Sequence, residues 1–218
     1  RCASHEPISR GWVAPRKDGA LVYASNRQWL IALAVEQRLL PSSVVNDEVR
    51  ERADKLTDEQ GYAPGRKALR ELKERGRTLA AAESITGGLV AHRVCLVPGA
   101  SDVFRGGVVT YTDDVKAREL GVPRDLLAAH GAVSEPVARA MAAGVRARFG
   151  TDYGVATTGF AGPTGGTDAE PVGTAYVALA HAGGVDVSRY GWIGTRAEVM
   201  SRTAKLALNL VRLHLLRG

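Results

Sequence analysis

Cysteine is nearly absent from this chain of 218 residues, which contains only Cys2 and Cys95. Two cysteines cannot build a disulfide framework or a paired-thiol zinc site, and their scarcity fits a reducing, cytoplasmic setting. Long apolar runs are lacking as well, because a run such as residues 29–35 is far shorter than the roughly 20 residues that a membrane span needs. With no segment that resembles a secretory signal, the sequence predicts a soluble cytoplasmic protein without a membrane partner.

Aromatic residues are also scarce, at 6% of the chain, and they do not alternate with basic residues as they do in RNA-binding modules. The formal net charge of +6 comes entirely from residues 62–218, which carry 20 Lys and Arg against 14 Asp and Glu, whereas residues 1–61 carry nine of each. Such an excess could attract a phosphorylated metabolite or a nucleic acid, but a surface charged for solubility explains it more simply. The missing motif argues against a nucleic-acid partner.

Residues 1–64 show little regular patterning. The first 24 residues contain prolines and glycines without a sustained period, which predicts loop or disorder. Helical patterns cover residues 26–40, which Pro41 ends, and the charged stretch 47–56. Neither carries recognisable chemistry, so we expect a partly helical or disordered N-terminal extension that forms no recognised domain.

From residue 65 onward, strand and helix patterns alternate. Apolar runs predict five strands, at residues 78–82, 107–111, 153–158, 174–180 and 185–193. Helical spacing and capping residues predict five helices, at residues 65–75, 89–96, 123–130, 134–149 and 195–216. Because strands alternate with helices and the last two strands form a hairpin, the pattern predicts a layered α/β domain over residues 65–218 with a mixed β-sheet.

The most informative motif is Glu-Ser-Ile-Thr-Gly-Gly at residues 83–88, between a predicted strand and a predicted helix. Open α/β sheets bind ligands at the carboxyl ends of their strands, and Gly87 and Gly88 allow close approach of the backbone. The free N–H groups of the new helix suit a phosphate or the oxyanion of an acyl-transfer intermediate. Ser84 or Thr86 is therefore a candidate nucleophile. The simpler alternative, which spacing alone favours, is that either hydroxyl caps the helix.

A serine nucleophile needs a base, and the nearest candidates come at the end of the second predicted strand and five residues beyond it. They are Tyr111 and Lys116. A desolvated lysine can lose its proton near neutral pH and replace the histidine of a serine triad, while a tyrosine could relay the proton or orient the serine. The commoner alternatives are that Tyr111 is a half-buried strand residue and Lys116 a solvated helix residue.

A glycine-rich loop follows the third predicted strand. Residues 157–167 have the sequence Thr-Thr-Gly-Phe-Ala-Gly-Pro-Thr-Gly-Gly-Thr, and their amides could hold a phosphate or a ribose. The loop is not a Walker loop, because no Gly-Lys-Ser/Thr follows, and it is not a dinucleotide fingerprint, because no helix opens directly from it. Plain connections use similar loops, so this signal is weak by itself.

The histidines show no metal-ligand spacing with one another or with acidic residues. His130 stands at a predicted helix end, where interaction with the helix C-terminus is the simpler role. We therefore expect no metal site and no cofactor. The five histidines are His5, His92, His130, His181 and His214.

Six blocks of the chain resemble the CinA C-terminal-domain family, in the family's order. The blocks are residues 82–88, 98–101, 104–111, 131–135, 158–163 and 171–174, so the resemblance extends from about residue 65 to residue 216. It implies a three-layer α/β/α sandwich with a mixed sheet, and a possible homodimer. The longer members carry a larger N-terminal molybdopterin-binding-like domain, for which the residues before Gly65 are too few, so the resemblance implies the stand-alone form.

The enzymatic members of the family are nicotinamide-nucleotide amidohydrolases. The resemblance therefore implies metal-free deamidation of nicotinamide mononucleotide to nicotinate mononucleotide and ammonia, in pyridine nucleotide salvage. Ser84 would attack the carboxamide carbon, amides around Thr86 and Gly87 would hold the oxyanion, and Lys116 with Tyr111 would manage the proton that leaves with ammonia. The implied substrate-binding residues are Thr86, Gly87, Gly88, Thr158, Gly159, Gly162, Gly165, Gly166 and Arg196.

Two departures from the family pattern bear on this mechanism. Ile85 stands where members often have a cysteine, which excludes a thiol nucleophile at that position. Thr195 replaces the aspartate of a Gly-Asp-Arg motif, so a carboxylate is lost although Arg196 remains. Because Ile85 could reshape the pocket, the alternative stays open that the chain is a catalytically silent member, which binds a nucleotide or a protein in competence or recombination.

Overall fold

The computed structural model describes residues 12–15, 21–24 and 63–217. The chain divides into two compact units, residues 1–60 and residues 61–218. In the first unit, β1 (Trp12–Pro15) and β2 (Leu21–Ala24) pair antiparallel, with Trp12 opposite Ala24. The expectation of loop or disorder is wrong for these two segments, because the two short apolar runs pair and satisfy each other's backbone groups. The helices expected at residues 26–40 and 47–56 lie outside the described residues.

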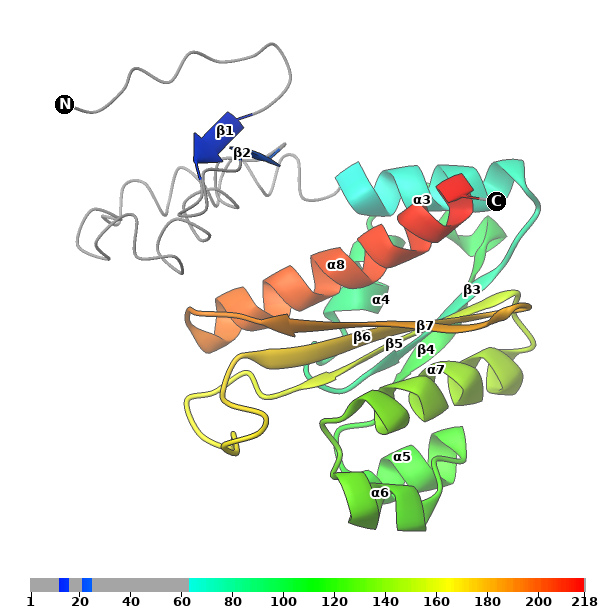
Figure 1. The fold of residues 1–218 in the computed structure, drawn as a ribbon. Helices are drawn as coiled ribbons and strands as arrows, with labels where there is room; N and C mark the ends of the chain where they lie inside the picture. Colours follow the sequence, from blue (N-terminus) through cyan, green and yellow to red (C-terminus); the bar gives the residue numbers. More distant parts are fainter. Residues whose placement is uncertain (1–11, 16–20, 25–62, 218) are drawn as a thin grey trace, which may run out of the picture. The chain divides into compact units, whose positions relative to one another are not determined.

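The second unit is built on a mixed sheet of five strands in the order β4-β3-β5-β6-β7 (Figure 1). The first three of these strands are parallel, and β6 and β7 are antiparallel to their neighbours. The two-residue turn between His181 and Gly184 closes the expected hairpin. The strands are β3 (Leu79–Glu83), β4 (Phe104–Val109), β5 (Tyr153–Gly159), β6 (Thr174–His181) and β7 (Gly184–Gly191).

Helices cover both faces of this sheet, which confirms the expected three-layer α/β/α architecture (Figure 1). One face carries α3 (Ala63–Glu74), α4 (Leu89–Cys95) and α8 (Arg196–Arg217), and we call it the α4/α8 face. The other carries α5 (Asp113–Leu120), α6 (Arg124–His130) and α7 (Glu135–Phe149), and we call it the α5/α7 face. Across the described residues, no helix is both long and apolar enough to cross a membrane.

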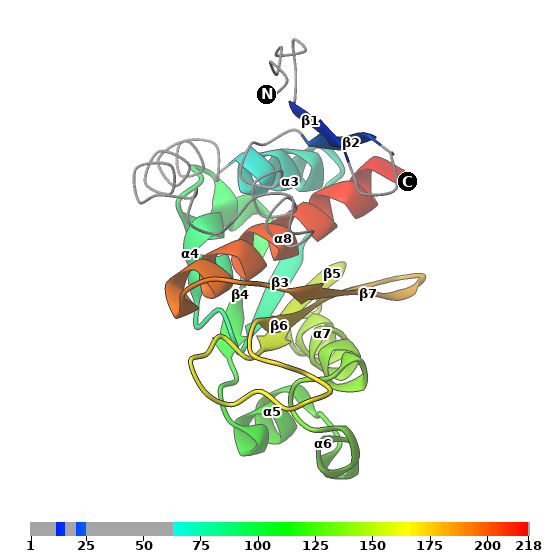
Figure 2. The same ribbon diagram turned by 60° about the vertical axis from the view of Figure 1, so that its left-hand side comes forward.

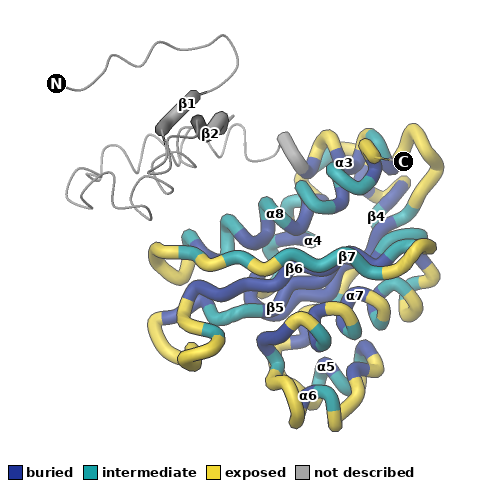
Figure 3. The backbone as a smooth tube through the Cα atoms, in the orientation of Figure 1, coloured by how far each residue is buried: buried dark blue, intermediate teal, exposed yellow. Residues whose placement is uncertain are grey.

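Alternate strand residues feed two separate hydrophobic cores. In β3, Leu79 and Ala81 pack under the α4/α8 face, whereas Ala80 and Ala82 pack under the α5/α7 face. Successive side chains of a strand point to opposite faces, so a strand covered on both sides must be apolar throughout. All five residues of β3 are buried, and Figure 3 shows the same for most of β6. The small alanines of β3 let both layers of helices pack closely.

Two local expectations need correction. The second strand was expected at residues 107–111 but is β4, Phe104–Val109, so Tyr111 lies beyond the strand and is 56% exposed rather than half-buried. Glycines at positions 106 and 107 concealed the start of this strand in the sequence. Ser134 is the N-cap residue of α7, as expected, but its hydroxyl donates to the Gly131 carbonyl instead of accepting from the helix.

Candidate active site

The turn from β3 into α4 is organised by the buried carboxyl group of Glu83. Its Oε2 accepts hydrogen bonds from the Gly88 amide (2.9 Å) and the Val90 amide (2.9 Å), and its Oε1 accepts one from the Ala91 amide (2.8 Å). Only 2% of the residue is exposed. The helix N–H groups that the sequence offered to a phosphate or oxyanion are therefore already satisfied from within the chain.

Thr86 belongs to the same network. Its hydroxyl donates to Glu83 Oε2 at 2.6 Å and lies 2.7 Å from the Thr157 hydroxyl, and the residue is completely buried. Both hydrogen-bonding functions of this hydroxyl are thus used inside the protein. What Thr86 can offer to a substrate is its backbone amide.

Two neighbouring amides of the turn are available. The Ser84 amide donates to the Thr157 carbonyl (2.9 Å) and the Gly87 amide donates to the Ser84 carbonyl (3.2 Å). Within the part of the chain that the structure describes, the amides of Ile85 and Thr86 have no hydrogen-bond partner. Two adjacent donors directly after a serine are the arrangement that stabilises an oxyanion, and they lie one residue earlier than Thr86 and Gly87, the pair expected from the sequence.

Ser84 lies on the opposite side of this segment from its two neighbours. Glu83 binds the start of α4, and Ile85 packs with Ala175 and Val199 under α8, so strand alternation directs Ser84 toward the α5/α7 face. The residue is 8% exposed, and within the described residues its hydroxyl has no hydrogen-bond partner. Ser84 does not cap α4, whose N-cap residue is Gly88 and has no side-chain cap. The capping alternative is therefore wrong for Ser84.

Ile85 fills a small apolar cluster instead of the space in front of Ser84. It is 3% exposed, and the cluster also contains Ala161 from the glycine-rich loop. A Cβ on Gly159 would lie 2.6 Å from Ile85 Cδ1 and 2.5 Å from the Thr174 carbonyl oxygen. Gly159 is thus required by close packing against Ile85 and β6.

Lys116, on α5, is buried on the same side of the sheet. It is the largest fully buried side chain among the described residues, with 1% exposed, so the interpretation as a solvated helix residue is wrong. Burial lowers the pKa of its ammonium group, and the Asp113 carboxylate, whose Oδ1 lies 3.7 Å from Nζ, partly opposes that change. A lysine in this setting is easier to deprotonate than a surface lysine.

Thr110 is a buried polar group to which the sequence analysis gave no role. Its amide donates to the Glu83 carbonyl at 2.8 Å, which places it beside the segment that carries Ser84. Its hydroxyl is buried and has no hydrogen-bond partner in the described part of the chain. Strand alternation from Val108, which packs under α7, puts this side chain on the α5/α7 face too. The sequence could have indicated this face, because Thr110 lies two residues after Val108 and alternate strand residues share a face.

Arg196 links Tyr111 to the glycine-rich loop. Its Nη2 donates to the Tyr111 hydroxyl at 2.6 Å, and its Nη1 donates to the Gly162 carbonyl at 2.9 Å. Figure 2 shows the loop between β5 and β6 at the end of the sheet where α8 begins. Thr195, directly before Arg196, forms a capping box, because its amide donates to Glu198 Oε2 (2.7 Å) and its hydroxyl accepts from the Glu198 amide (3.4 Å). The replacement of aspartate by threonine therefore still anchors the helix that carries Arg196.

The remaining predicted residues lie at the end of β5 and in the loop that follows it. The Thr158 hydroxyl donates to the Ala132 carbonyl at 2.7 Å, on the α5/α7 face. Gly162 has a φ of 79°, a conformation that favours glycine, while Gly165 and Gly166 lie in an exposed stretch of the loop. These features shape the rim of the candidate site next to Arg196.

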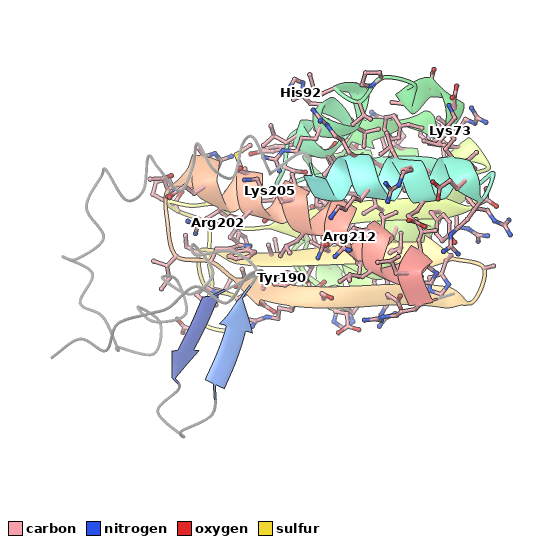
Figure 4. All side chains as sticks on the ribbon, turned by 90° about the horizontal axis from the view of Figure 1, so that it is seen from above. Lys73, His92, Tyr190, Arg202, Lys205 and Arg212 are labelled. Atoms are coloured by element: carbon pink, nitrogen blue, oxygen red, sulfur yellow. The ribbon has the colours of Figure 1, made fainter. Side chains whose placement is uncertain are left out.

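The basic excess lies mostly elsewhere. Arg202, Lys205 and Arg212 are spaced along α8 (Figure 4), on the α4/α8 face of the sheet. Ser84 and Lys116 belong to the other face. The net charge of the domain thus gives no independent support for a phosphate-bearing ligand.

The fold brings two of the histidines together with a carboxylate, in a cluster that their spacing in sequence does not predict. His181, Asp186 and His214 offer ligand atoms that all lie within 4.8 Å of one another. Their positions in sequence show no metal-ligand spacing, because the fold brings together a strand end, its hairpin partner and the end of a helix.

Comparison with known protein families gives two matches. The model described as "CinA C-terminal domain" matches residues 64–215. The model described as "Putative exonuclease, RdgC" matches residues 1–78, and the two matches overlap at α3.

Known relatives agree with the first match. A CinA-like protein of Gemmatimonas aurantiaca is 54% identical over 144 residues, which cover 66% of this chain and 34% of the relative. A CinA-like protein of Anaeromyxobacter sp. is 48% identical over 172 residues, 77% of this chain and 42% of the relative. The chain thus spans well under half the length of these relatives.

Solved structures match over nearly their whole length. A CinA superfamily protein from Klebsiella pneumoniae has a TM-score of 0.70 and 32% identity, over 72% of this chain and 99% of that one. The competence/damage inducible protein CihA from Agrobacterium tumefaciens has a TM-score of 0.67 and 34% identity, over 71% and 94%.

Proposed function

The chain belongs to the CinA C-terminal domain family through residues 64–215, and we propose that this domain is an amidohydrolase that converts nicotinamide mononucleotide to nicotinate mononucleotide and ammonia. The observation that carries the proposal is that Ser84, whose hydroxyl has no partner in the described part of the chain, precedes two available amides on the sheet face where Lys116 is buried. A nucleophile, an oxyanion site and a deprotonatable base are the groups that acyl transfer needs.

In the proposed reaction, the Ser84 hydroxyl attacks the carboxamide carbon and gives its proton to the neutral Lys116 amine. The amides of Ile85 and Thr86 stabilise the negative oxygen of the tetrahedral intermediate. Lys116 then returns the proton to the leaving nitrogen, ammonia departs, and water hydrolyses the acyl-enzyme by the same steps in reverse order.

Tyr111 and Arg196 are proposed to act at the rim. The Tyr111 hydroxyl accepts a hydrogen bond from Arg196, which leaves its own proton to orient Ser84 or the substrate. Arg196 and the loop containing Gly159, Gly162, Gly165 and Gly166 are proposed to hold the ribose phosphate, so that binding energy remote from the amide positions it for attack. Gly87 and Gly88 are proposed to support this site through the backbone of the turn, and Thr158 through the hydrogen bond from its hydroxyl to the Ala132 carbonyl.

The test is release of ammonia from nicotinamide mononucleotide by the purified chain, without added metal. We expect Ser84→Ala to lower kcat by about 10⁴-fold or more and to leave the urea unfolding midpoint unchanged. The exposed Ser101→Ala is the matched control and should be fully active. Undiminished turnover by Ser84→Ala would contradict the proposed mechanism.

Binding of the nucleotide without ammonia release by the unaltered chain would favour the catalytically silent alternative. Light scattering of the same sample tests the proposed homodimer.

A second candidate function concerns residues 1–78. The match to a family described as a putative exonuclease makes nucleic acid the candidate ligand of this segment. Residues 1–61 carry equal numbers of basic and acidic side chains, so no charge excess supports it. Binding of a fluorescent DNA duplex, with an affinity that falls as salt rises, would support this function, and its absence at low salt would remove it.

A further inference from the structure

The cluster of His181, Asp186 and His214 lies at the end of the sheet away from Ser84. His181 ends β6, whose first residues adjoin the glycine-rich loop, Asp186 follows the hairpin turn, and His214 stands near the end of α8 (Figure 1). Eight residues of an extended strand, roughly 25 Å, separate the two ends of β6. Nothing in the proposed deamidation uses these three side chains.

We propose that His181, Asp186 and His214 form a binding site for a divalent transition-metal ion with the ligand preferences of Zn²⁺. Two imidazole nitrogens and one carboxylate oxygen form a common zinc ligand set, with a fourth position left for water. Asp186 Oδ2 lies 3.2 Å from His214 Nδ1 and 3.6 Å from His181 Nε2. Ligands about 2.0–2.1 Å from a tetrahedral ion are about 3.4 Å apart, so both separations fit one shared ion.

The missing hydrogen bond at His181 Nε2 is an independent observation in favour of a ligand. Its Nε2 is buried and has no hydrogen-bond partner among the described residues. The other ring nitrogen, Nδ1, accepts a hydrogen bond from the Gly183 amide at 3.1 Å, so without a metal the ring proton is on Nε2. A buried N–H without an acceptor is costly, and a metal at Nε2 removes that cost.

Metal binding has one local consequence that can be followed. When the ion replaces the proton on Nε2, the neutral ring carries its proton on Nδ1, and the Gly183 amide loses its acceptor. Ala182 and Gly183 are exposed, so water can accept from that amide instead. The hairpin turn therefore adapts to the ion without disturbing the strands.

The charges around the cluster also suit a cation. Among the described residues, the ion pairs of Asp186 are with the two histidines, and no Lys or Arg pairs with it. The carboxylate is 45% exposed, which gives an ion a path from solvent. The two imidazoles lie 4.1 Å apart, and Tyr153 packs edge-on against His214 at 5.5 Å. The ring of His214 is thus held in place before any ion arrives.

Because the cluster joins the β6–β7 hairpin to the end of α8, the bound ion is expected to stabilise the domain and to leave the chemistry at Ser84 unchanged. The experiment uses the untagged full chain, freed of metal with a chelator and titrated with ZnSO₄ by calorimetry and native mass spectrometry. We expect one Zn²⁺ per chain and a rise in the melting temperature that a chelator reverses.

Variants assign the site. Asp186→Asn and His214→Gln should each weaken zinc binding at least tenfold, and His92→Gln, a histidine on α4, should bind as the unaltered chain does. Circular dichroism shows whether each variant is folded, and Asp186→Asn serves if His214→Gln is not. The proposal is overturned if zinc does not bind saturably at micromolar concentration. It is also overturned if folded Asp186→Asn binds zinc as tightly as the unaltered chain. A third contrary result is a melting temperature of Asp186→Asn that lies below that of the unaltered chain by the same amount with and without zinc, because the three side chains then stabilise the domain only through their own hydrogen bonds.

Discussion

The two faces of the sheet differ sharply at the point where β3 ends. On the α4/α8 face, the Glu83 carboxyl group accepts four hydrogen bonds and the Thr86 hydroxyl is fully used. On the α5/α7 face, within the described residues, the hydroxyls of Ser84 and Thr110 have no partner, and Lys116 is buried with a single carboxylate 3.7 Å away.

Glu83 and Ser84 are consecutive residues, but this difference gives them different expected roles. A fully hydrogen-bonded buried group holds the turn in one conformation, whereas buried groups left without partners cost stability and are retained where a ligand supplies the missing contacts. Glu83 is thus expected to matter for folding, and the groups around Ser84 for turnover.

The largest expected effect on stability comes from removing the Glu83 carboxyl group, whose hydrogen bonds are all made within the protein. Glu83→Ala leaves the buried amide of Val90 and the part-buried amides of Gly88 and Ala91 without an acceptor, so we expect a loss of about 3 kcal/mol or more in the free energy of unfolding. Urea denaturation followed by circular dichroism measures it. Glu135→Ala, which removes an exposed carboxylate from the first turn of α7, is the control and should cost less than about 1 kcal/mol. Equal losses in both variants would remove the distinction between the two faces.

The second prediction tests the α5/α7 face, through Lys116. Lys116→Met should lower kcat by about 10³-fold and raise the free energy of unfolding at pH 6 by about 1 kcal/mol, because a buried charge is replaced by an apolar side chain of similar length. Burial lowers the pKa of Lys116, so its cost to folding is greatest below that pKa and disappears as pH rises toward the value of the unfolded chain. The gain in stability should therefore shrink between pH 6 and pH 10.

Lys73→Met, at an exposed position of α3, is the control and should leave turnover unchanged. A destabilised Lys116→Met would mean that this lysine is structural.

The third prediction concerns Asp113, the one carboxylate that pairs with Lys116 among the described residues. Asp113 holds the pKa of Lys116 higher than burial alone would set it, so Asp113→Asn should lower that pKa further. If neutral Lys116 is the base, the acidic limb of the profile of kcat/KM against pH moves to lower pH in this variant. Asp125→Asn, in the first turn of the neighbouring α6, should leave the limb in place. A limb that stays put in Asp113→Asn would assign it to another group.

The smallest effect is expected at Ile85. Ile85→Cys leaves a cavity in the cluster with Ala161, Ala175 and Val199, at a cost of about 1–2 kcal/mol, while the amide that faces the oxyanion is unchanged. Turnover should be preserved. The double variant Ser84→Ala with Ile85→Cys should stay inactive, because the thiol points into the apolar cluster. Recovery of ammonia release in the double variant would show that position 85 can reach the substrate.

Much of the fold could be predicted from the sequence, for reasons visible in single elements. Helix α7 was marked by Ser134 before it and by Gly150, which ends it in the left-handed conformation. The hairpin β6–β7 was marked by Gly183 and Gly184 between two apolar runs. The start of β4 was predicted three residues too late because Gly106 and Gly107 carry no strand signal. Gly107 is nevertheless required, since a Cβ at this position would lie 2.7 Å from the Ala81 carbonyl oxygen.

The candidate site was predictable in its location but not in its hydrogen bonds. The strand-to-helix turn and the resemblance to a family pointed to Ser84, whereas the sequence could not show that Glu83 occupies the helix amides. The burial of Lys116 and the unpartnered Thr110 depend on how α5 packs against the sheet. The cluster of His181, Asp186 and His214 depends on contacts between residues 28 positions apart, which no local spacing reveals.

The Glu83 carboxyl group also has a consequence for how the proposed substrate would bind. Helix α4 points the positive end of its dipole at the turn, and the internal carboxyl group neutralises it. In the proposed reaction, the helix dipole at the segment around Ser84 therefore adds little attraction for a phosphate, and the segment suits the uncharged carboxamide. The anionic end of the proposed nucleotide would lie at the rim, where Arg196 supplies the charge. A carboxyl group that never touches the substrate would thereby orient it, with its neutral end toward the nucleophile.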